Sequence, residues 1–291
     1  MKKVKILITG GAGFVGSHLC EHLAKDKKNE IYSLDNYSMG STANHMQNVR
    51  YIEGETSQIN ELINFSPSIV YHLGEYSRVE QSFDDIHTVW ESNKNGIFSV
   101  LEFVRKVGCK IVYAGSSTKF GDSGSARNAS PYAWTKATNT ELVINYGKWF
   151  KIPYAITYFY NVYGKREIEH GKYATLIALW INKMKNNEDL EIVSPGHQER
   201  NFTHVKDIID GLVLVGEHGT GDEFGIGSPE SFSIIELAKI FGGNIKMIDE
   251  RKGNRMSADL VDKKTRSLGW SPKHKLEDYI EELRSNQWKH K

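Results

Sequence analysis

A glycine-rich turn near the start of the chain most constrains how this sequence can fold. Residues 9–16 read TGGAGFVG, and the glycines at 10, 13 and 16 follow a short apolar run of strand type, Val4 to Thr9. Beyond the turn, apolar residues recur with helical spacing from Phe14 to Lys25. A glycine turn between a strand and a helix lets the backbone approach a pyrophosphate closely, while the helix N-terminus supplies amide donors. The sequence therefore predicts a dinucleotide site at this turn.

The alternation of strand and helix continues through the first half of the chain. Further predicted strands are the short apolar runs at residues 31–34, 69–73, 110–114 and 154–158, and helices are expected at about 59–65 and 93–107. Strands that alternate with helices form βαβ units, which build a parallel sheet with helices on both faces. We therefore expect an α/β fold with a doubly wound parallel sheet of the Rossmann type.

The pattern becomes irregular beyond Asn161, so a second, smaller unit is expected there. A helix is predicted near 173–185, another after His204, and one more strand at Phe224–Gly227. We expect residues 1–160 plus about 200–228 to form the dinucleotide-binding domain. About 161–199 plus 229–291 are then expected to form a smaller, interleaved C-terminal lobe that binds the substrate.

Composition narrows the class of protein. The 37 basic and 36 acidic residues nearly cancel, so no global field favours nucleic acid or an anionic membrane. No stretch approaches the roughly 20 apolar residues of a membrane span. Cys20 and Cys109 are expected to be reduced structural thiols, which fits a cytoplasmic protein. His18 and His22 lie four apart on a predicted helix, but no further ligand cluster supports a metal site.

The residue that follows the second predicted strand indicates which dinucleotide binds. Asp35 stands 19 residues beyond Gly16. A carboxylate at that strand end accepts hydrogen bonds from the adenosine ribose and repels a 2′-phosphate. We therefore expect NAD rather than NADP.

A second motif predicts proton transfer. Tyr132 and Lys136 are one helical turn apart, and Ser116 follows a predicted buried strand. A free tyrosine has a pKa near 10, and lowering it by about three units takes roughly 4 kcal/mol of preferential stabilisation of the phenolate. The lysine and a bound nicotinamide can supply that stabilisation. Together with the dinucleotide site, the pair indicates redox chemistry on an alcohol.

Over nearly its whole length the chain resembles the extended short-chain dehydrogenase/reductases of the nucleotide-sugar epimerase and dehydratase family. The matching motifs, in order, are TGGAGFVGSHL, Asp35-Asn36, His72-Leu73-Gly74, SSTKFG at 116–121, SPYAWTK at 130–136, YNVYG at 160–164, RNFTHVKD at 200–207 and LGW at 268–270.

The resemblance implies a role for each site residue. Ser116 would bond the sugar alcohol, Tyr132 would take its proton, and Lys136 would hold Tyr132 and the nicotinamide ribose. NAD would be contacted by these two and by Gly10, Gly13, Phe14, Val15, Gly16, Asp35, Asn36, Glu55, Thr56 and Leu73. The nucleotide-diphosphate sugar would be contacted by Ser117, Thr118, Asn161, Arg200 and Arg251. The helices at about 93–107 and 132–150 would pair with those of a second copy into the four-helix bundle of a homodimer.

The resemblance also limits the reaction. Relatives share hydride removal from carbon 4 of the sugar, and the 4,6-dehydratases carry an acid where this chain has Ser117 and Thr118. Neutral hydroxyls do not replace that acid near pH 7, which argues against dehydration and decarboxylation. Two hypotheses about the reaction remain. The protein is either a 4-epimerase, which is the commoner activity in the family, or a net 4-dehydrogenase or reductase. A non-catalytic NAD-binding sensor or scaffold is the alternative from another class. Departures from the family pattern, among them Lys119 and Tyr158, bear on which sugar is used.

Overall fold

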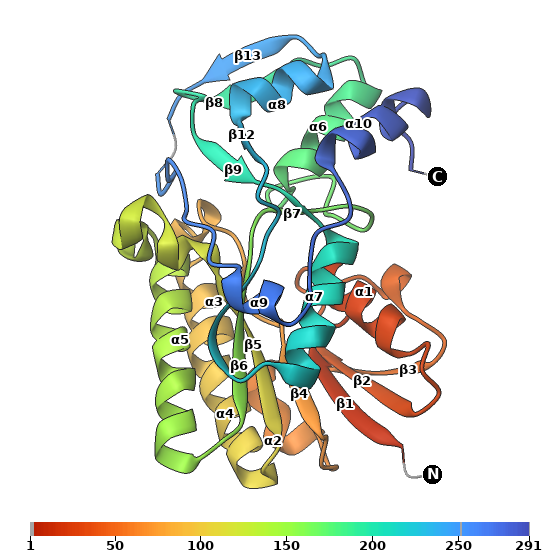
Figure 1. Cartoon of the computed structure of the whole chain (residues 1–291), viewed down its shortest axis with the longest axis vertical. Helices are drawn as coiled ribbons and strands as arrows, with labels where there is room; N and C mark the ends of the chain where they lie inside the picture. Colours follow the sequence, from red (N-terminus) through yellow and green to blue (C-terminus); the bar gives the residue numbers. More distant parts are fainter. Residues whose placement is uncertain (1–2, 251, 291) are drawn as a thin grey trace.

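A computed structural model describes residues 3–250 and 252–290. Its centre is a seven-stranded sheet in the order β11-β6-β5-β4-β1-β2-β3, in which every neighbouring pair is parallel. The strands are β1 (Val4–Thr9), β2 (Asn29–Asp35), β3 (Val49–Glu53), β4 (Ile69–His72), β5 (Lys110–Ser116), β6 (Tyr154–Phe159) and β11 (Gly221–Ile226). The strand order reverses between β1 and β4, so the predicted doubly wound α/β fold is confirmed (Figure 1).

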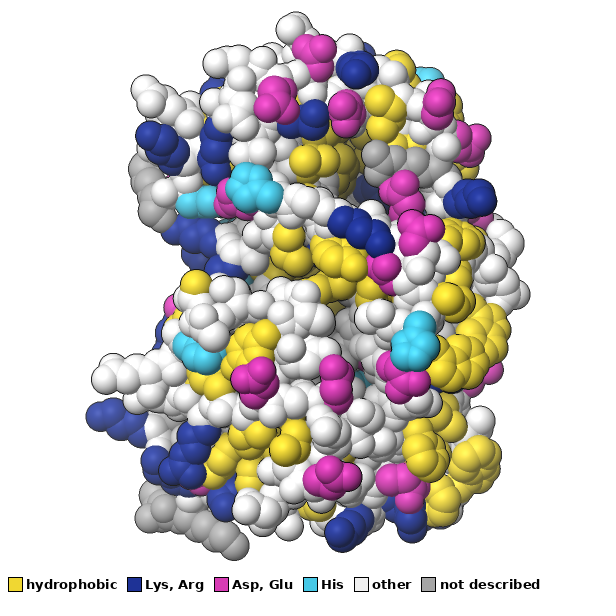
Figure 2. Space-filling model, turned by 180° about the vertical axis from the view of Figure 1, so that it is seen from behind, with side chains coloured by type: hydrophobic (Ala, Val, Ile, Leu, Met, Phe, Trp, Pro, Cys, Tyr) yellow, Lys and Arg dark blue, Asp and Glu magenta, His cyan; other side chains and the backbone are white. Residues whose placement is uncertain are grey.

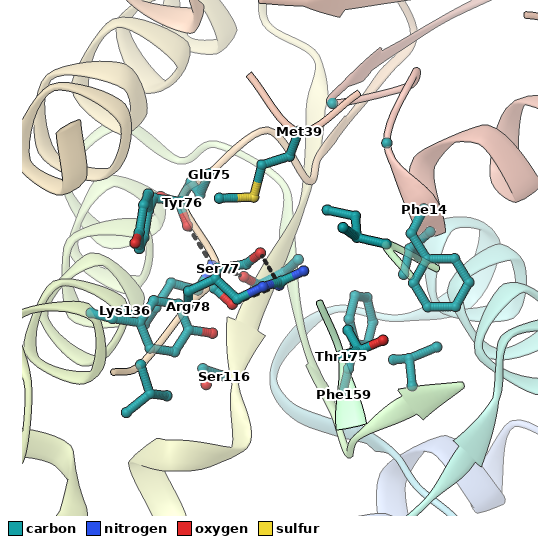
Figure 3. A pocket seen from close by; sticks show the side chains of 18 of the residues that line it. Phe14, Met39, Glu75, Tyr76, Ser77, Arg78, Ser116, Lys136, Phe159 and Thr175 are labelled. Carbon is teal, nitrogen blue, oxygen red and sulfur yellow. Dashed lines mark hydrogen bonds and ion pairs between the residues drawn. The ribbon is translucent and has the colours of Figure 1, made fainter. Parts of the chain in front are cut away.

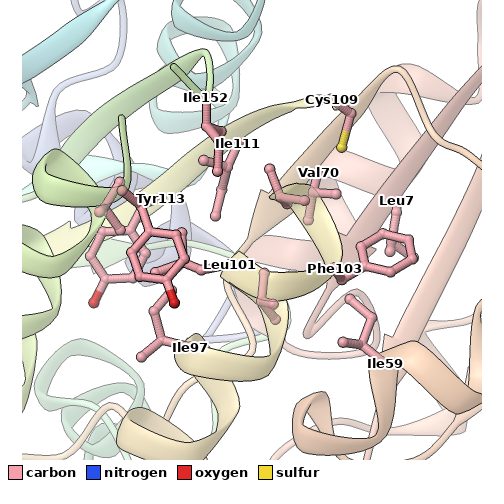
Figure 4. Close-up of a cluster of buried hydrophobic side chains, with 14 of the residues drawn as sticks. Leu7, Ile59, Val70, Ile97, Leu101, Phe103, Cys109, Ile111, Tyr113 and Ile152 are labelled. Atoms are coloured by element: carbon pink, nitrogen blue, oxygen red, sulfur yellow. The ribbon is translucent and has the colours of Figure 1, made fainter. Parts of the chain in front are cut away.

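Helices cover both faces of the sheet. On one face lie α1 (Phe14–Leu23) and α7 (Val205–His218), and on the other α2 (Ile59–Leu62), α4 (Gly96–Val107) and α5 (Pro131–Phe150). Strand β1 shows why: Leu7 packs in the cluster with α4, while Ile6 and Ile8 pack in the cluster with α1 and α7. Successive strand side chains point to opposite faces, and both faces here are buried. Figure 4 shows the α4 side of this core.

A smaller lobe stands over the carboxyl ends of the strands (Figure 1). Its elements are α6 (Leu176–Lys185), β8 (Leu190–Val193), β9 (Glu199–Asn201), β12 (Ser231–Ser233), α8 (Ile234–Phe241), β13 (Ile245–Ile248) and α10 (Leu276–Ser285). It has a core of its own, in which the Trp180 and Phe241 rings meet edge to face at 5.4 Å. Short parallel strands β7 (Val162–Tyr163) and β10 (Thr203–His204) pair where the chain passes to and from the lobe.

The remaining elements are short. They are α3 (Ile86–Val89), α9 (Lys263–Ser267), a π-helical stretch at Trp90–Asn95, and 3-10 turns at Thr42–Asn44, Thr56–Gln58, Gln81–Phe83, Ser117–Phe120 and Asp122–Asn128. Among the described residues, none of the helices combines the length and apolar character needed to cross a bilayer.

Two helix boundaries and one strand differ from the sequence-based expectation. The helix expected from residue 93 begins at Ile86, and the π-helical stretch separates α3 from α4. The helix expected to reach residue 65 ends at Leu62, because Ile63 is already extended. Strand β3 was not anticipated; it is an edge strand whose pairing to β2 is set by tertiary contact.

The two cysteines are buried and free. Burial raises the pKa of Cys20 to about 12 and that of Cys109 to about 11, so neither is a thiolate near neutral pH. The prediction of reduced structural thiols is confirmed.

Because Leu101 on α4 is completely buried, its truncation is expected to leave a cavity against the sheet. We predict that Leu101→Ala lowers the free energy of unfolding by about 2–5 kcal/mol, measured by urea denaturation. The control is Lys106→Ala on the exposed side of the same helix, which should change it by less than about 0.5 kcal/mol. Equal losses in both variants would contradict this packing.

Candidate active site

A cavity of about 920 Å³ lies between the carboxyl ends of the sheet strands and the smaller lobe. Figure 3 shows Glu75, Ser116 and Lys136 on one side of it and Phe14 on the other. The predicted cofactor and substrate residues that line it are Gly10, Gly13, Phe14, Val15, Gly16, Asp35, Asn36, Glu55, Thr56, Leu73, Ser116, Ser117, Thr118, Tyr132, Lys136, Asn161 and Arg200. The structure therefore brings these residues together, while Arg251 lies outside the described residues.

The glycine-rich turn forms one end of the cavity. Gly10 has φ +74°, and a Cβ there would lie 2.9 Å from the Cα of Gly74, which follows β4. A Cβ at Gly16 would lie 2.0 Å from the carbonyl oxygen of Gly10. Side chains at these positions would push the turn away from the sheet, so glycine keeps the backbone close and its amides accessible at the start of α1.

Asp35 braces the same turn. Its Oδ2 accepts a hydrogen bond from Ala12 N at 2.8 Å, and its Oδ1 accepts one from Tyr37 N at 2.9 Å. Burial raises the pKa of Asp35, while these amide donors act in the opposite direction. A carboxylate has about four acceptor sites, so these amide donors do not use all of them. Beside it, Asn36 Nδ2 donates to Glu55 Oε2 at 2.9 Å, which fixes the next part of the wall.

The residues predicted to transfer the proton come from two elements. Ser116 ends β5, and its Oγ accepts hydrogen bonds from Thr118 Oγ1 at 2.9 Å and Thr118 N at 3.3 Å. Tyr132 and Lys136 lie on the first turns of α5. That helix begins here because Ser130 Oγ accepts a bond from Ala133 N at 3.1 Å and proline stands at the first helical position.

Lys136 is held by groups that the sequence reasoning did not identify. Its ammonium forms an ion pair with Glu75 and donates to the carbonyl of Ala114. Glu75 is 2% exposed and also accepts hydrogen bonds from Tyr113 Oη and Asn139 Nδ2, both at 2.9 Å. The sequence signal for Glu75 is its place: it follows His72-Leu73-Gly74 at the carboxyl end of β4, the edge where open α/β sheets bind ligands.

Two arginines supply positive charge on the smaller-lobe side. Arg200 Nη2 donates to Arg255 O at 2.7 Å and to Asn254 Oδ1 at 3.0 Å, so backbone and amide oxygens hold it without a carboxylate among these partners. Arg255 Nη2 donates to Ser117 Oγ at 3.2 Å, and within the described chain its buried Nη1 has no hydrogen-bond partner. Burial lowers the pKa of Arg200 to about 10. Such guanidinium groups favour an anionic ligand, and Arg255 was missed by the sequence reasoning.

Two departures from the family pattern explain each other. Lys119 Nζ lies 3.0 Å from both Tyr158 Oη and Asp222 Oδ2, and Tyr158 Oη donates to Asp222 Oδ1 at 2.6 Å. None of the three lines the cavity. This partly buried cluster joins β6 and β11, so Lys119 and Tyr158 make their contacts within the sheet and do not line the cavity.

Comparison with known proteins identifies the family. A model described as the NAD dependent epimerase/dehydratase family matches residues 6–227. The chain belongs to this family. The predicted family, enzyme class and cofactor NAD are thereby confirmed.

The relatives of this epimerase/dehydratase family member carry out different reactions. It is 28% identical to UDP-glucuronic acid decarboxylase 3 of Arabidopsis thaliana (94% of this chain, 86% of the relative). It is 30% identical to a putative UDP-glucose 4-epimerase of Methanocaldococcus jannaschii, with 96% of both chains covered. Among solved structures, UDP-glucose 4-epimerase from Thermotoga maritima with UDP-glucose has a TM-score of 0.88 at 25% identity, covering 97% of this chain and 99% of that one. Pal from Bacillus thuringiensis has a TM-score of 0.89 at 27% identity, with 98% of both covered.

The described parts of this family member contain no group of three or more His, Cys, Asp or Glu side chains that could hold a metal ion. His18, one of the two helical histidines, bonds through Nε2 to the carbonyl of Lys165 at 2.9 Å.

A second buried acid lines the cavity from the segment after β7. Glu167 Oε1 accepts a hydrogen bond from Gly164 N at 2.9 Å, and Oε2 accepts one from Thr175 Oγ1. Burial raises the pKa of Glu167 to about 7 in spite of these donors. The sequence reasoning did not single out this residue, because its burial depends on how the segment folds back.

We predict that Glu167 makes the stability of the fold depend on pH. Between about pH 4.5 and 7 the unfolded chain has released a proton that the folded chain still holds, so the free energy of unfolding falls as pH rises, by up to about 3 kcal/mol. Glu167→Gln removes this loss. Urea denaturation should therefore show that the free energy of unfolding of the variant rises relative to that of wild type from pH 5 to pH 8. The control Glu188→Gln, at an exposed position, should follow wild type. Parallel pH profiles for wild type and Glu167→Gln would contradict the prediction.

Proposed function

We propose that this protein is a nucleotide-diphosphate sugar 4-epimerase. The proposal depends on one observation: the two residues after Ser116 are neutral hydroxyl residues whose side chains take part in hydrogen bonds. Thr118 supports Ser116 through a 2.9 Å hydrogen bond, and Ser117 accepts from Arg255. A dehydratase or a decarboxylase needs further steps after the oxidation at carbon 4. In a dehydratase, a free acid beside Ser116 would catalyse the proton transfer of those steps. With hydroxyls there, return of the hydride is the outcome that the site supports best.

The cavity fits NAD. The turn has no room for a Cβ at Gly10 or Gly16, and Asp35 lies beside it with acceptor capacity left for ribose hydroxyls. In this proposal Gly13, Phe14, Val15 and Gly16 hold the pyrophosphate at the start of α1, and Asn36, Glu55, Thr56 and Leu73 surround the adenosine side. Bound there, NAD would supply the acceptor for the hydride of carbon 4 and the donor for its return.

The protein's own groups move the proton. Ser116 Oγ bonds the carbon 4 hydroxyl and orients it toward Tyr132, whose phenolate oxygen accepts its proton as the 4-keto sugar forms. Lys136 stabilises that phenolate by its positive charge. For the keto-sugar to be reduced on its other face, it has to turn within the cavity, and Tyr132 then returns the proton.

The diphosphate gives the sugar an anchor during this turn. Arg200 and Arg255 lie on the smaller-lobe side, and within the described residues none of their hydrogen-bond partners is a carboxylate; Asn161 also lines the cavity. Charge-assisted bonds from guanidinium to phosphate are strong and directional. We propose the smaller lobe, about residues 161–199 and 229–291, as the nucleotide-sugar-binding part, and residues 1–160 with about 200–228 as the NAD-binding part.

A stoichiometry tests the reaction class. The protein is incubated with UDP-, GDP- and dTDP-sugars, UDP-glucose and UDP-glucuronic acid included, and converted sugar is compared with NADH absorbance at 340 nm. If the protein is a 4-epimerase, we expect an isomeric product with almost no accumulated NADH. One NADH per converted sugar would establish a 4-dehydrogenase instead. Loss of water or of carbon dioxide, seen by mass spectrometry, would establish a dehydratase or a decarboxylase.

We predict that Tyr132→Phe lowers kcat at least about a thousandfold, because the proton of the carbon 4 hydroxyl loses its acceptor. NAD affinity, measured by calorimetry, should change less than about threefold, since the ring stays in place. Activity near the wild-type level would contradict the role of Tyr132.

We further propose that the protein is a homodimer. Exposed apolar side chains gather on α3, α4, α5 and the π-helical stretch: Ile86, Trp90, Phe98, Trp134, Trp149 and Phe150. Figure 2 shows hydrophobic side chains along the right-hand edge, which is the α4 and α5 side of Figure 1. Patches of this kind mark interfaces, and pairing α4 and α5 with a second copy gives a four-helix bundle.

Light scattering after size-exclusion chromatography checks the dimer. Wild type should have twice the chain mass of 33.0 kDa. Phe98→Asp, at a side chain 54% exposed, should be monomeric because a charge is placed in the bundle. Met247→Asp on β13, 47% exposed, is the matched control and should remain dimeric. A monomeric wild type would contradict the proposal.

A further inference from the structure

A buried acid that lines the cavity, Glu75, forms an ion pair with Lys136. We propose that Glu75 is a positioning residue: it anchors Lys136 beside Ala114 and sets the pH range in which Tyr132 can accept a proton. This inference rests on the proposed function, because it concerns the proton-transfer step of that same site.

Glu75 is fixed from several elements at once. Tyr113 on β5 and Asn139 on α5 donate to it, and His72 Nε2 on β4 lies 3.6 Å from Oε1. The other ring nitrogen of His72 is 2.7 Å from Thr9 Oγ1, and Thr9 Oγ1 accepts a bond from Gly74 N at 3.0 Å. A line of contacts therefore runs from the glycine-rich turn at the end of β1 to the lysine of α5.

The carboxylate is ionised throughout the working pH range. Burial alone would raise the pKa of Glu75, but Lys136 and His72 outweigh it and hold the pKa at about 2. Lys94 on the π-helical stretch adds a further positive charge near it. The negative charge of Glu75 therefore offsets part of the positive charge that Lys136 presents to the cavity.

The geometry also limits where Lys136 can point. An ammonium has three donors, and two of them are used by Glu75 and the Ala114 carbonyl. One donor remains for the ribose or for Tyr132. The Lys136 side chain is 7% exposed, so the ion pair is shielded from solvent. The geometry of the pair therefore determines which group the third N–H of Lys136 can reach.

Other charges act on Tyr132 from different elements. Arg78 follows β4, Arg255 comes from the segment before α9, and both interact electrostatically with the tyrosine, as does Tyr113 on β5. Glu75 is ion-paired with Lys136, so its negative charge opposes the positive charge by which Lys136 stabilises a phenolate. Removing the negative charge of Glu75 should therefore make Tyr132 more acidic.

The test uses Glu75→Gln, which keeps the shape of the side chain and removes the charge. We expect the acidic limb of the pH profile of kcat/KM to move down by about one pH unit. The KM for the sugar should change less than about twofold, because Glu75 does not contact the diphosphate region. The control Asp222→Asn removes a carboxylate from another lysine pair outside the cavity and should leave the limb unmoved.

A second readout does not depend on turnover. The phenolate of Tyr132 is titrated by its absorbance near 295 nm in the NAD-bound protein, as the difference from Tyr132→Phe, with and without Glu75→Gln. A downward shift in this titration supports the positioning role even if no sugar is converted, in which case the epimerase proposal alone fails. Should Glu75→Gln fail to fold, Glu75→Asp, which withdraws the charge by one methylene, should shift the titration partway. An unmoved titration in the folded variants overturns the inference.

Discussion

The buried ion pair between Glu75 and Lys136 is the interaction on which the proposed chemistry depends. It joins the end of β4 to α5 and, through the Ala114 carbonyl, to β5. Both partners are almost fully buried, so either one alone would be an uncompensated charge in a poorly solvated place. The pair thus fixes the lysine where the carboxyl ends of the central strands meet, and it decides how much positive charge the nearby Tyr132 experiences.

The rest of the cavity follows from the same topology. Parallel strands place their carboxyl ends at one edge, and the reversal of strand order between β1 and β4 opens a crevice there. One end of this crevice is formed by backbone atoms, because the turn has no room for a side chain at Gly10 or Gly16. The smaller lobe closes it with Arg200 and Arg255. Both ends therefore favour an anionic ligand, and we propose that the sugar lies over Ser116 and Tyr132.

Local patterns predicted most of the fold and part of the site. The turn at residues 9–16 and the Tyr132–Lys136 spacing could be identified because each lies within a single strand-to-helix connection or helix. Glu75, Arg255 and Glu167 could not, because they reach the cavity only through contacts between distant segments. Lys119 and Tyr158 were interpreted as bearing on the choice of sugar. In the structure both form hydrogen bonds with Asp222 on β11. Edge strand β3 escaped prediction for the same reason, since its pairing with β2 is a tertiary contact.

The most direct test of the central claim, that hydride leaves carbon 4 and returns to it, is the fate of an isotope. A nucleotide sugar carrying deuterium at carbon 4 is converted by the protein, and the product is examined by mass spectrometry and NMR. We expect that deuterium remains at carbon 4 with the configuration inverted and that none enters the free NADH pool. Deuterium found in released NADH, or a product with carbon 4 unchanged and a group lost elsewhere, would contradict it.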